Sequence, residues 1–246
     1  MKIFFDNYER IVNKLQGLLN FEVKMMEIIP GIHLIRGRVS NCYIVVNEDI
    51  MLIDTGMPGN SSKIIKYVKS LNRSPNDIKT IVITHNHFDH VGSLSKMKEI
   101  TGAKIAVHPA DADYIRGKGQ HVGSTFINAI IKLIGVIYRV KPVEPEILLQ
   151  DGDLIGEYRV IHTPGHSPGS ICLYNPKNKA IFVGDNLQYR EGKLHNPGEQ
   201  LIPEPEKYKE SMKKLLELDI EIILTGHTKA VTSGGSELLR EFVDEF

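Results

Sequence analysis

Three histidines and one aspartate fall within the six residues His85-Asn86-His87-Phe88-Asp89-His90. Neutral imidazole nitrogens and carboxylate oxygens are the ligands that a borderline cation such as zinc prefers. Only Thr84 separates the cluster from residues 81–83, an apolar, β-branched run that is typical of a buried strand. Loops at strand ends are where a rigid scaffold usually presents chemistry. The pattern therefore favours a metal site over a polar turn with surface histidines.

Three further potential ligands stand in the same kind of place. His166 follows the apolar run 160–161, Asp185 follows Gly184, and His227 follows Gly226. Glycine lets the backbone pass close to a crowded centre. A lone histidine is usually just a hydrogen-bonded polar residue, but several loops of one design are expected to converge on one site.

The first half of the chain must position the cluster, and its hydrophobic pattern changes along the way. Residues 3–20 have apolar positions at helical spacing and predict an amphipathic helix. Residues 21–54 contain short β-rich runs with turn residues between them, which predicts an antiparallel meander ending at Asp54. A helix over 61–71, a strand over 80–83, a helix over 92–100 and a strand over 104–107 follow. This alternation is the α/β signature.

The second half repeats this order. The runs 146–149, 154–155, 158–162, 171–174 and 180–183 predict a second meander. A helix over 205–218, a strand over 221–224 and a C-terminal helix from Ser236 come after it. We therefore expect an α/β (α+β) chain with two similar halves, packed sheet to sheet with the helices outside. No linker divides the chain, so residues 1–246 are predicted to form one domain.

Residues 110–145 interrupt the alternation and are predicted to be a helical insertion. Residues 126–138 are unusually apolar, with Lys132 between them. A helix covering the core is one interpretation. A lid over the site, or a homodimer contact through residues 125–140, are the others, because exposed apolar patches usually mark partners or ligands.

Composition bounds the class of protein. The 246 residues carry 30 basic and 30 acidic side chains, so the charge balance gives no support for nucleic-acid binding. Cys42 and Cys172 are too few for a disulfide framework. No apolar run reaches the roughly 18 residues of a membrane span, and the N-terminus lacks signal-peptide character. We expect a cytoplasmic protein with a small-molecule substrate and no membrane partner.

The chain resembles the metallo-β-lactamase-fold hydrolases. Residues 85–90 match the family's H-x-H-x-D-H motif, and the remaining ligands follow in the expected order up to His227. The resemblance implies a four-layer αβ/βα sandwich with a dinuclear metal site at one edge. It assigns the ligands as follows: His85, His87 and His166 to the first metal, Asp89, His90 and His227 to the second, Asp185 as the bridge, and Asp54 as an acid that hydrogen-bonds a ligand.

The implied chemistry is hydrolysis. Three imidazoles leave a metal with open positions, and a bridging carboxylate holds two cations about 3.5–4 Å apart. Water between them loses a proton near neutral pH, and the resulting hydroxide attacks a carbonyl or a phosphorus. Histidine at position 87 argues against the diiron flavoprotein branch, which has glutamate there. Zinc is the predicted metal, with iron and manganese as alternatives.

The substrate stays open between branches of the family. Glyoxalase-type thioesterases share the ligands, but only about 20 residues follow His227 here, where that branch has a glutathione-binding extension. Lactonases have a similar length and a tyrosine soon after the bridging acid. We therefore predict an ester, thioester or lactone. A phosphodiesterase or ribonuclease of the same fold and a non-catalytic scaffold member are the alternatives, and the intact ligand set counts against the latter.

Asp89 and Tyr189 are the candidate catalytic residues. Tyr189 lies four residues after Asp185 and is expected either to donate to a carbonyl oxygen or to pack as an ordinary tyrosine. His195 and Asn196 lie in a Gly/Pro-rich loop, 192–203, that is expected to border the cleft. The histidines outside the ligand pattern are assigned structural roles, with His162 at most supporting a ligand; these are His33, His108, His121 and His162.

Overall fold

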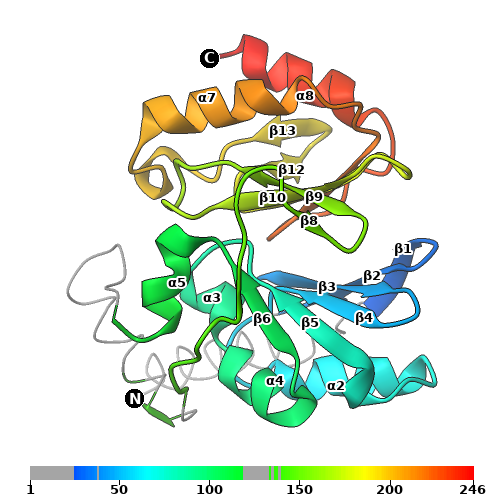
Figure 1. Ribbon diagram of the computed structural model, residues 1–246. Helices are drawn as coiled ribbons and strands as arrows, with labels where there is room; N and C mark the ends of the chain where they lie inside the picture. The colour runs from blue at the N-terminus through cyan, green and yellow to red at the C-terminus, as the bar shows by residue number, and fades with distance from the viewer. Residues whose placement is uncertain (1–24, 38, 119–132, 134–135, 138–139) are drawn as a thin grey trace, which may run out of the picture.

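The computed structural model describes residues 25–37, 39–118, 133, 136–137 and 140–246 (Figure 1). The predicted helix over residues 3–20, most of the apolar stretch 126–138 and His121 lie outside the described residues. Within that stretch, the side chains of Leu133, Val136 and Ile137 are exposed. The single domain, the insertion at 110–145 and its role as lid, dimer contact or core helix therefore stay predictions.

The first sheet combines a meander with parallel strands. In the described part of the chain it has seven strands in sequence order, β1 to β7. Neighbours are antiparallel from β1 to β4 and parallel from β4 to β7. The bounds are β1 Met25–Ile29, β2 Ile32–Arg36, β3 Asn41–Val46, β4 Ile50–Ile53, β5 Ile78–Val82, β6 Lys104–Val107 and β7 Ile147–Leu148.

The second sheet has the order β14-β11-β10-β9-β8. Its pairs are antiparallel except β11 with β14. A separate hairpin, β12 with β13, lies beside it. The bounds are β8 Leu154–Ile155, β9 Tyr158–His162, β10 Ile171–Asn175, β11 Ala180–Gly184, β12 Gln188–Arg190, β13 Lys193–His195 and β14 Ile222–Thr225.

Helices cover the outer face of each sheet, so the layers run helix, sheet, sheet, helix (Figure 1). In the view of Figure 1, α2 and α4 lie below the first sheet, and α7 and α8 lie above the second. The helices and 3₁₀ turns are α2 Ser61–Ser70, η1 Pro75–Asp77, α3 Phe88–Val91, α4 Leu94–Thr101, α5 Pro109–Ile115, η2 Glu199–Leu201, α7 Pro205–Leu215 and α8 Gly235–Asp244.

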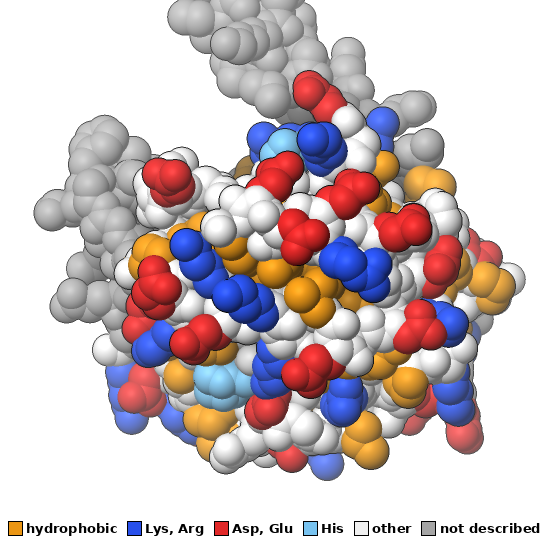
Figure 2. Space-filling model, turned by 90° about the horizontal axis from the view of Figure 1, so that it is seen from above, with side chains coloured by type: hydrophobic (Ala, Val, Ile, Leu, Met, Phe, Trp, Pro, Cys, Tyr) orange, Lys and Arg blue, Asp and Glu red, His pale blue; other side chains and the backbone are white. Residues whose placement is uncertain are grey.

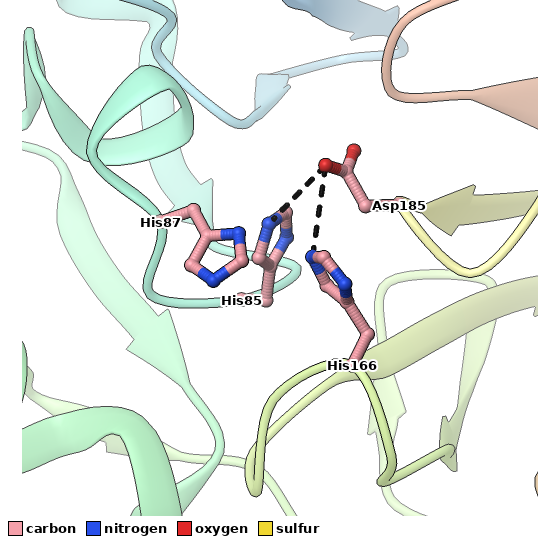
Figure 3. Close-up of side chains that lie close together, drawn as sticks. All are labelled: His85, His87, His166 and Asp185. Carbon is pink, nitrogen blue, oxygen red and sulfur yellow. Dashed lines mark ion pairs between the residues drawn. The ribbon is translucent and has the colours of Figure 1, made fainter. Parts of the chain in front are cut away.

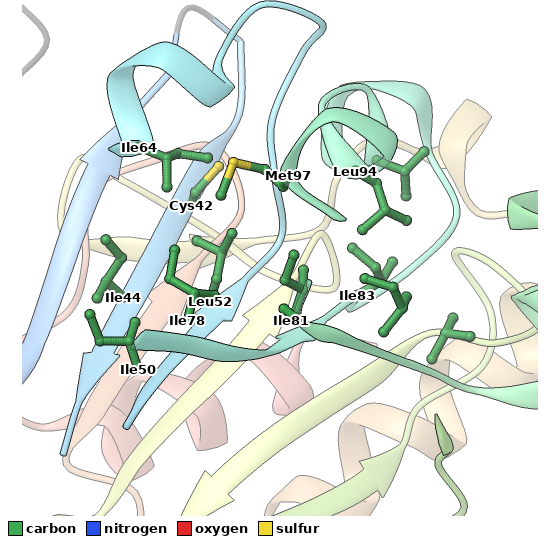
Figure 4. Packing of buried hydrophobic residues seen from close by; sticks show 14 of the residues in the cluster. Cys42, Ile44, Ile50, Leu52, Ile64, Ile78, Ile81, Ile83, Leu94 and Met97 are labelled. Carbon is green, nitrogen blue, oxygen red and sulfur yellow. The ribbon is translucent and has the colours of Figure 1, made fainter. Parts of the chain in front are cut away.

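The pleat of the strands explains why two sheets pack together. In β4, Leu52 packs toward the helices and Ile53 toward the other sheet, and in β5, Ile81 and Val82 divide in the same way. Successive strand residues point to opposite faces, so a strand that is apolar on both faces must be covered on both. Figure 4 shows the cluster between the first sheet and its helices. Each such buried side chain stabilises the fold by about 1.5–3 kcal/mol.

The predicted αβ/βα sandwich is confirmed, but two local predictions are wrong. The sequence pattern places residues 146–149 at the start of the second meander, whereas β7 joins the first sheet, parallel to β6. The Glu146 carboxylate accepts the Ile105 N–H, which pins this segment beside β6. The predicted loop 192–203 begins instead with β13, because Glu191 and Gly192 adopt positive φ angles of 52° and 84° in a two-residue hairpin turn.

The charges on the surface are mixed, and the two cysteines do not form a disulfide, as the composition indicates. Over α7 and α8, acidic and basic side chains intermingle, with no patch of one sign (Figure 2). Cys42 and Cys172 are both buried and unpaired. Among the described helices, none has the length and apolar character to cross a membrane.

Candidate metal centre

Strand ends from both sheets meet at one edge of the sandwich and bring the seven predicted ligands together. They form two groups, in each of which one ligand atom per residue lies within 4.8 Å of the others. The first group is His85, His87, His166 and Asp185, and the second is Asp89, His90 and His227. Figure 3 shows the first group, with two imidazoles from the loop after β5 facing a histidine and an aspartate from the second sheet.

Asp185 lies between the two groups. Its Oδ2 is 3.7 Å from Nε2 of His85 and 3.7 Å from Nε2 of His166. On the other side, Oδ1 is 3.1 Å from His90 Nε2, and Oδ2 is 2.8 Å from His227 Nε2. One carboxylate therefore faces imidazoles of both groups, which is the placement that a bridging ligand needs.

The second group is closed by Asp89. Its Oδ2 is 3.4 Å from His227 Nε2 and 3.8 Å from His90 Nε2, and the two imidazole nitrogens are 3.4 Å apart. The Ser40 hydroxyl donates to the Asp89 carbonyl and fixes the backbone of this residue. Asp89 and His227 are about one fifth exposed at their side chains, so this group faces solvent more than the first.

In four of the histidines, the ring nitrogen that points away from the centre is held by an oxygen. His90 Nδ1 lies 2.8 Å from Asp54 Oδ2, and His85 Nδ1 lies 3.0 Å from Thr84 Oγ1. His166 and His227 donate from Nδ1 to the carbonyls of residues 201 and 39, at 2.7 and 2.8 Å. Such contacts place the proton on Nδ1 and leave the Nε2 lone pair facing inward when the ring is neutral.

Asp54 links two of these contacts. It accepts the Thr84 N–H at Oδ1 (2.9 Å) and the Thr84 hydroxyl at Oδ2 (2.7 Å), and the same Oδ2 holds His90. With its hydroxyl proton given to Asp54, Thr84 Oγ1 is the acceptor for His85 Nδ1–H. Asp54 itself has a φ of 57°, a conformation that costs a non-glycine residue about 1–2 kcal/mol. The fold keeps that strain where the carboxylate orients the imidazoles.

Burial and charge divide the imidazoles into two kinds. Burial lowers the pKa of His85 and His166, and it lowers the pKa of His87 to about 4, so these rings are neutral near pH 7. Burial also acts to lower the pKa of His90 and His227, but neighbouring carboxylates outweigh it. Asp185 together with Asp54 raises the pKa of His90, and mainly Asp185 raises the pKa of His227. Near pH 7 the second group therefore attracts positive charge, as a proton or as a cation.

The donor set fits a metal. Nε2 of His85, Nε2 of His166 and Oδ1 of Asp185 are buried, and none has a hydrogen-bond partner among the described residues. Leaving a buried polar atom unsatisfied costs about 1–3 kcal/mol. Lone pairs that face one another across a few ångströms cannot satisfy one another, whereas a cation placed between them satisfies all of them.

Two glycines leave room for this packing. A Cβ at position 226 would lie 2.2 Å from Asp185 Oδ1, and a Cβ at position 184 would lie 2.8 Å from Thr84 Oγ1. Gly184 also has a φ of 51°. The predicted close approach of backbone to the centre is therefore real at both positions.

Asp111 is a supporting residue that the sequence did not single out. It lies in the first turn of α5, is fully buried, and binds both loops of the first group. Its Oδ2 accepts the Asn86 N–H (2.9 Å) and the Ser167 hydroxyl (2.8 Å), and its Oδ1 accepts the Gly169 N–H (2.9 Å). An acid in a helix beginning Pro-Ala-Asp normally faces solvent, so only the tertiary contacts identify its role.

A cleft of about 590 Å³ opens beside the second group and reaches His227. Tyr189 lines it, half-buried, while its backbone N–H donates to the Thr228 hydroxyl (2.7 Å). His195 and Asn196 are not among the described residues that line it: His195 is paired in the β12–β13 hairpin, and Asn196 caps a turn at Gly198.

The described histidines outside the ligand set have structural contacts. His33 lies 3.0 Å from the Tyr67 hydroxyl, and His108 stacks on His162 with ring centroids 3.9 Å apart. His162 Nε2 donates to the Pro168 carbonyl and thereby supports the loop of His166.

Comparison with known proteins agrees with this geometry. The family model described as Metallo-beta-lactamase superfamily matches residues 35–227. A Bacillus subtilis relative, "Probable metallo-hydrolase YflN", is 26% identical over 228 residues, covering 82% of this chain and 85% of that protein. "Acyl-coenzyme A thioesterase MBLAC2" of Bos taurus is 32% identical over 168 residues, covering 61% and 58%. The crystal structure of a metallo-beta-lactamase family protein from Thermus thermophilus, TTHA1429, superposes with a TM-score of 0.68 at 21% identity, covering 89% and 80%.

Proposed function

Because the chain belongs to the metallo-β-lactamase superfamily and is a hydrolytic enzyme, we propose that it cleaves a thioester, ester or lactone carbonyl with two divalent metal ions. The observation that supports two ions is the arrangement of the ligand atoms. Two groups of side chains lie on either side of Asp185, and three buried atoms in the first group make no hydrogen bond to a described residue.

Each side chain has a distinct proposed task. His85, His87 and His166 would hold the first ion, Asp89, His90 and His227 would hold the second, and Asp185, which faces imidazoles of both groups, would be shared between them. When bound, the ions supply Lewis acidity toward the carbonyl and activate a water. The neutral imidazoles of the first group need lose no proton to bind, since burial keeps their pKa low. Zinc suits this nitrogen and oxygen set best, with iron or manganese as alternatives.

Tyr189 and Asp89 are the proposed catalytic residues. Tyr189 lines the cleft that reaches His227, from where a phenol hydroxyl can donate to the carbonyl oxygen of a bound substrate. Asp89 has a carboxylate oxygen 3.4 Å from His227 Nε2, and its side chain is about one fifth exposed, so it is placed to accept a proton as well as to bind metal.

The thioester is favoured among the three carbonyl substrates. The support is the relative named as an acyl-coenzyme A thioesterase, at 32% identity. A panel that contains an acyl-coenzyme A, S-lactoylglutathione, aryl esters, lactones and bis-p-nitrophenyl phosphate tests this choice. We expect turnover of the thioesters to exceed that of the rest. Turnover of the phosphodiester alone would overturn the substrate class and favour the phosphodiesterase alternative.

Metal analysis tests the two-ion site directly. We expect about two equivalents of metal per chain, the number that a bridged pair requires. Asp185→Ala should lose the paired ions and turnover together, because it removes the carboxylate shared by both groups. Asp219→Ala is the matched control, since the Asp219 carboxylate is exposed and pairs with Lys179 at the surface. Less than one equivalent in the wild type, or full activity in Asp185→Ala, would refute the proposal.

A further inference from the structure

The cleft beside His227 is lined by more positive than negative side chains. Its lining contains three cations, Arg36, Arg190 and Lys229, and one carboxylate, Glu191, which leaves a formal excess of two positive charges. The whole chain has a formal net charge of zero, so this excess is local. The other described lining residues are Gly37, Val39, Asn41, Tyr189, Gly192, His227 and Thr228.

The three cations are available to a ligand. None of them is ion-paired to a carboxylate in the described part of the chain, whereas Arg73 and Arg116 on other surfaces pair with nearby acids. Arg190 and Lys229 are exposed and Arg36 is half-buried. A cation that the fold leaves unpaired beside a reaction centre is free to bind an anionic group of a substrate.

The segments that carry these cations are fixed relative to the metal site. The Asn41 side chain donates to the carbonyls of Thr225 and Thr228, both at 2.9 Å, which ties the loop after Arg36 to the loop of His227. The Tyr189 N–H joins β12 to the same loop. His227 Nδ1 donates to the carbonyl of residue 39. Hydrogen bonds therefore hold the cleft next to the metal site, and three distant parts of the chain form it.

We propose that this cleft binds an anionic group, a phosphate or a carboxylate, on the part of the substrate that leaves after cleavage. The proposal rests on the function given above and narrows it, from carbonyl substrates in general to those with an anion beyond the scissile bond. Arginine binds phosphate and carboxylate through paired N–H groups, and lysine adds a point charge. The volume of about 590 Å³ accommodates a sizeable leaving group beside the ions.

Substrates that share one acyl group test the proposal. The acyl-coenzyme A ester carries phosphates, the glutathione thioester carries carboxylates, and the N-acetylcysteamine thioester carries neither. We expect the wild type to favour at least one anionic thioester over the neutral one by about tenfold or more in kcat/KM. If the acyl-coenzyme A ester has the higher kcat/KM, the cleft binds phosphate, and if the glutathione thioester has it, the cleft binds carboxylate. Equal kcat/KM for all three, or preference for the neutral one, would overturn the proposal.

Substitutions of the residues that line the cleft should change the preference for anionic substrates in opposite directions, depending on the charge that is removed. Arg190→Gln and Lys229→Gln should each lower the ratio of anionic to neutral kcat/KM by about tenfold or less, through KM, because each removes one partly solvated charge. Glu191→Gln should raise that ratio, by about twofold, because it removes the repelling carboxylate. Lys193→Gln is the matched control: Lys193 lies in the same hairpin, pairs with Glu245, and does not line the cleft. Ratios that move equally in the control, or not at all, would refute the assignment.

Binding of an inert probe separates this proposal from the proposed function. Adenosine 3′,5′-bisphosphate and glutathione are titrated calorimetrically into the metal-loaded wild type and Arg190→Gln. If no thioester is hydrolysed but a probe binds and binds about tenfold more weakly to the variant, the anion site stands and the thioesterase activity fails. If the thioesters are hydrolysed but neither probe distinguishes the two proteins, the activity stands and the anion site fails.

Discussion

Replacing the carboxylate of Asp111 should loosen the loops that carry the first metal group. Asp111 is fully buried and accepts three hydrogen bonds, from the backbone of Asn86 and Gly169 and from the Ser167 hydroxyl. Asp111→Asn retains the shape but turns one acceptor into a donor. With the amide oxygen at the Oδ2 position, the Gly169 N–H faces an NH₂ group and loses its partner. One buried, unsatisfied N–H costs about 1–3 kcal/mol.

The alanine variant is the harsher change. Asp111→Ala leaves the N–H groups of Asn86 and Gly169 unpaired, whereas the Ser167 hydroxyl still has Ser170 Oγ at 2.8 Å. The summed cost, about 2–6 kcal/mol at about 1–3 kcal/mol for each N–H, approaches the total stability of an ordinary domain. The asparagine variant is therefore the informative one. Its matched control is Asp113→Asn in the same helix, whose carboxylate is 71% exposed and pairs with Arg116 at the surface. That change should cost less than about 0.5 kcal/mol.

Two measurements distinguish support of the metal loops from plain stability. Urea unfolding of both variants gives the loss of unfolding free energy. Competition with a chromophoric chelator gives zinc affinity, which should fall about 10–100-fold in Asp111→Asn, as expected for a group that positions metal-bearing loops. Unchanged zinc affinity with reduced stability would show that the Asp111 hydrogen bonds stabilise the fold but do not position the metal ligands. Equal behaviour of the two asparagine variants would refute the reasoning altogether.

Three further changes probe the neighbouring contacts. Asp54→Asn removes the charge that faces His90 Nδ1, so zinc occupancy after dialysis against buffered zinc should fall from about two toward one. Gly226→Ala places a Cβ 2.2 Å from Asp185 Oδ1, so both ions and turnover should be lost, as metal analysis and a thioester assay will show. Glu146→Gln should lower the melting temperature at pH 7 but not near pH 3. Burial acts to raise the Glu146 pKa, but the Ile105 N–H and Lys98 outweigh it and lower it, so its stabilisation is present above the usual pKa and is lost as pH falls.

Each of these changes has an internal check. Gly102→Ala controls for the glycine change, because no atom lies within 4 Å of its Cβ and only its φ of 67° opposes the substitution; metal content should stay at the wild-type value. Asp54→Asn with unchanged occupancy would show that the His90 contact does not support the second ion. A melting-temperature difference for Glu146→Gln that persists at pH 3 would show that the carboxylate charge is not the cause.

The sandwich was predictable because its hydrophobic pattern is strong. Buried strands such as β4 and β11 read as continuous apolar runs, and helices such as α2 and α7 place their apolar residues at helical spacing. The error at β7 has a tertiary cause. Its two-residue pairing with β6 is fixed by Glu146 and by the Leu149 N–H on the Val107 carbonyl, and neither contact leaves a trace in periodicity.

The ligands were easier to find than the residues that hold them. His85 to His90 are close in sequence, and each remaining ligand follows an apolar strand, so a local pattern finds all seven. Asp111 and Thr84 have no such pattern, because an acid or a hydroxyl becomes informative only when burial and its partners are known. The ligand roles stay predictions until metal is measured, but the structure shows that the predicted side chains converge.

Substrate choice is separable from the ligand set, since the same seven side chains suit any carbonyl that two ions can polarise. The residues that distinguish one substrate from another must therefore lie outside the ligand set, and in the cleft beside His227 the chain brings Arg36, Arg190 and Lys229 together from three segments. These three cations are distant in sequence and come together only in the folded protein. The net charge of the whole chain, which is zero, therefore does not reveal the positive charge of the cleft. Measuring kcat/KM at increasing salt concentration tests this assignment independently of mutation. The kcat/KM of an anionic thioester should fall as ionic strength rises, whereas the kcat/KM of the neutral thioester should not change. The same dependence of kcat/KM on salt for both substrates would show that the cations of the cleft do not contact the leaving group.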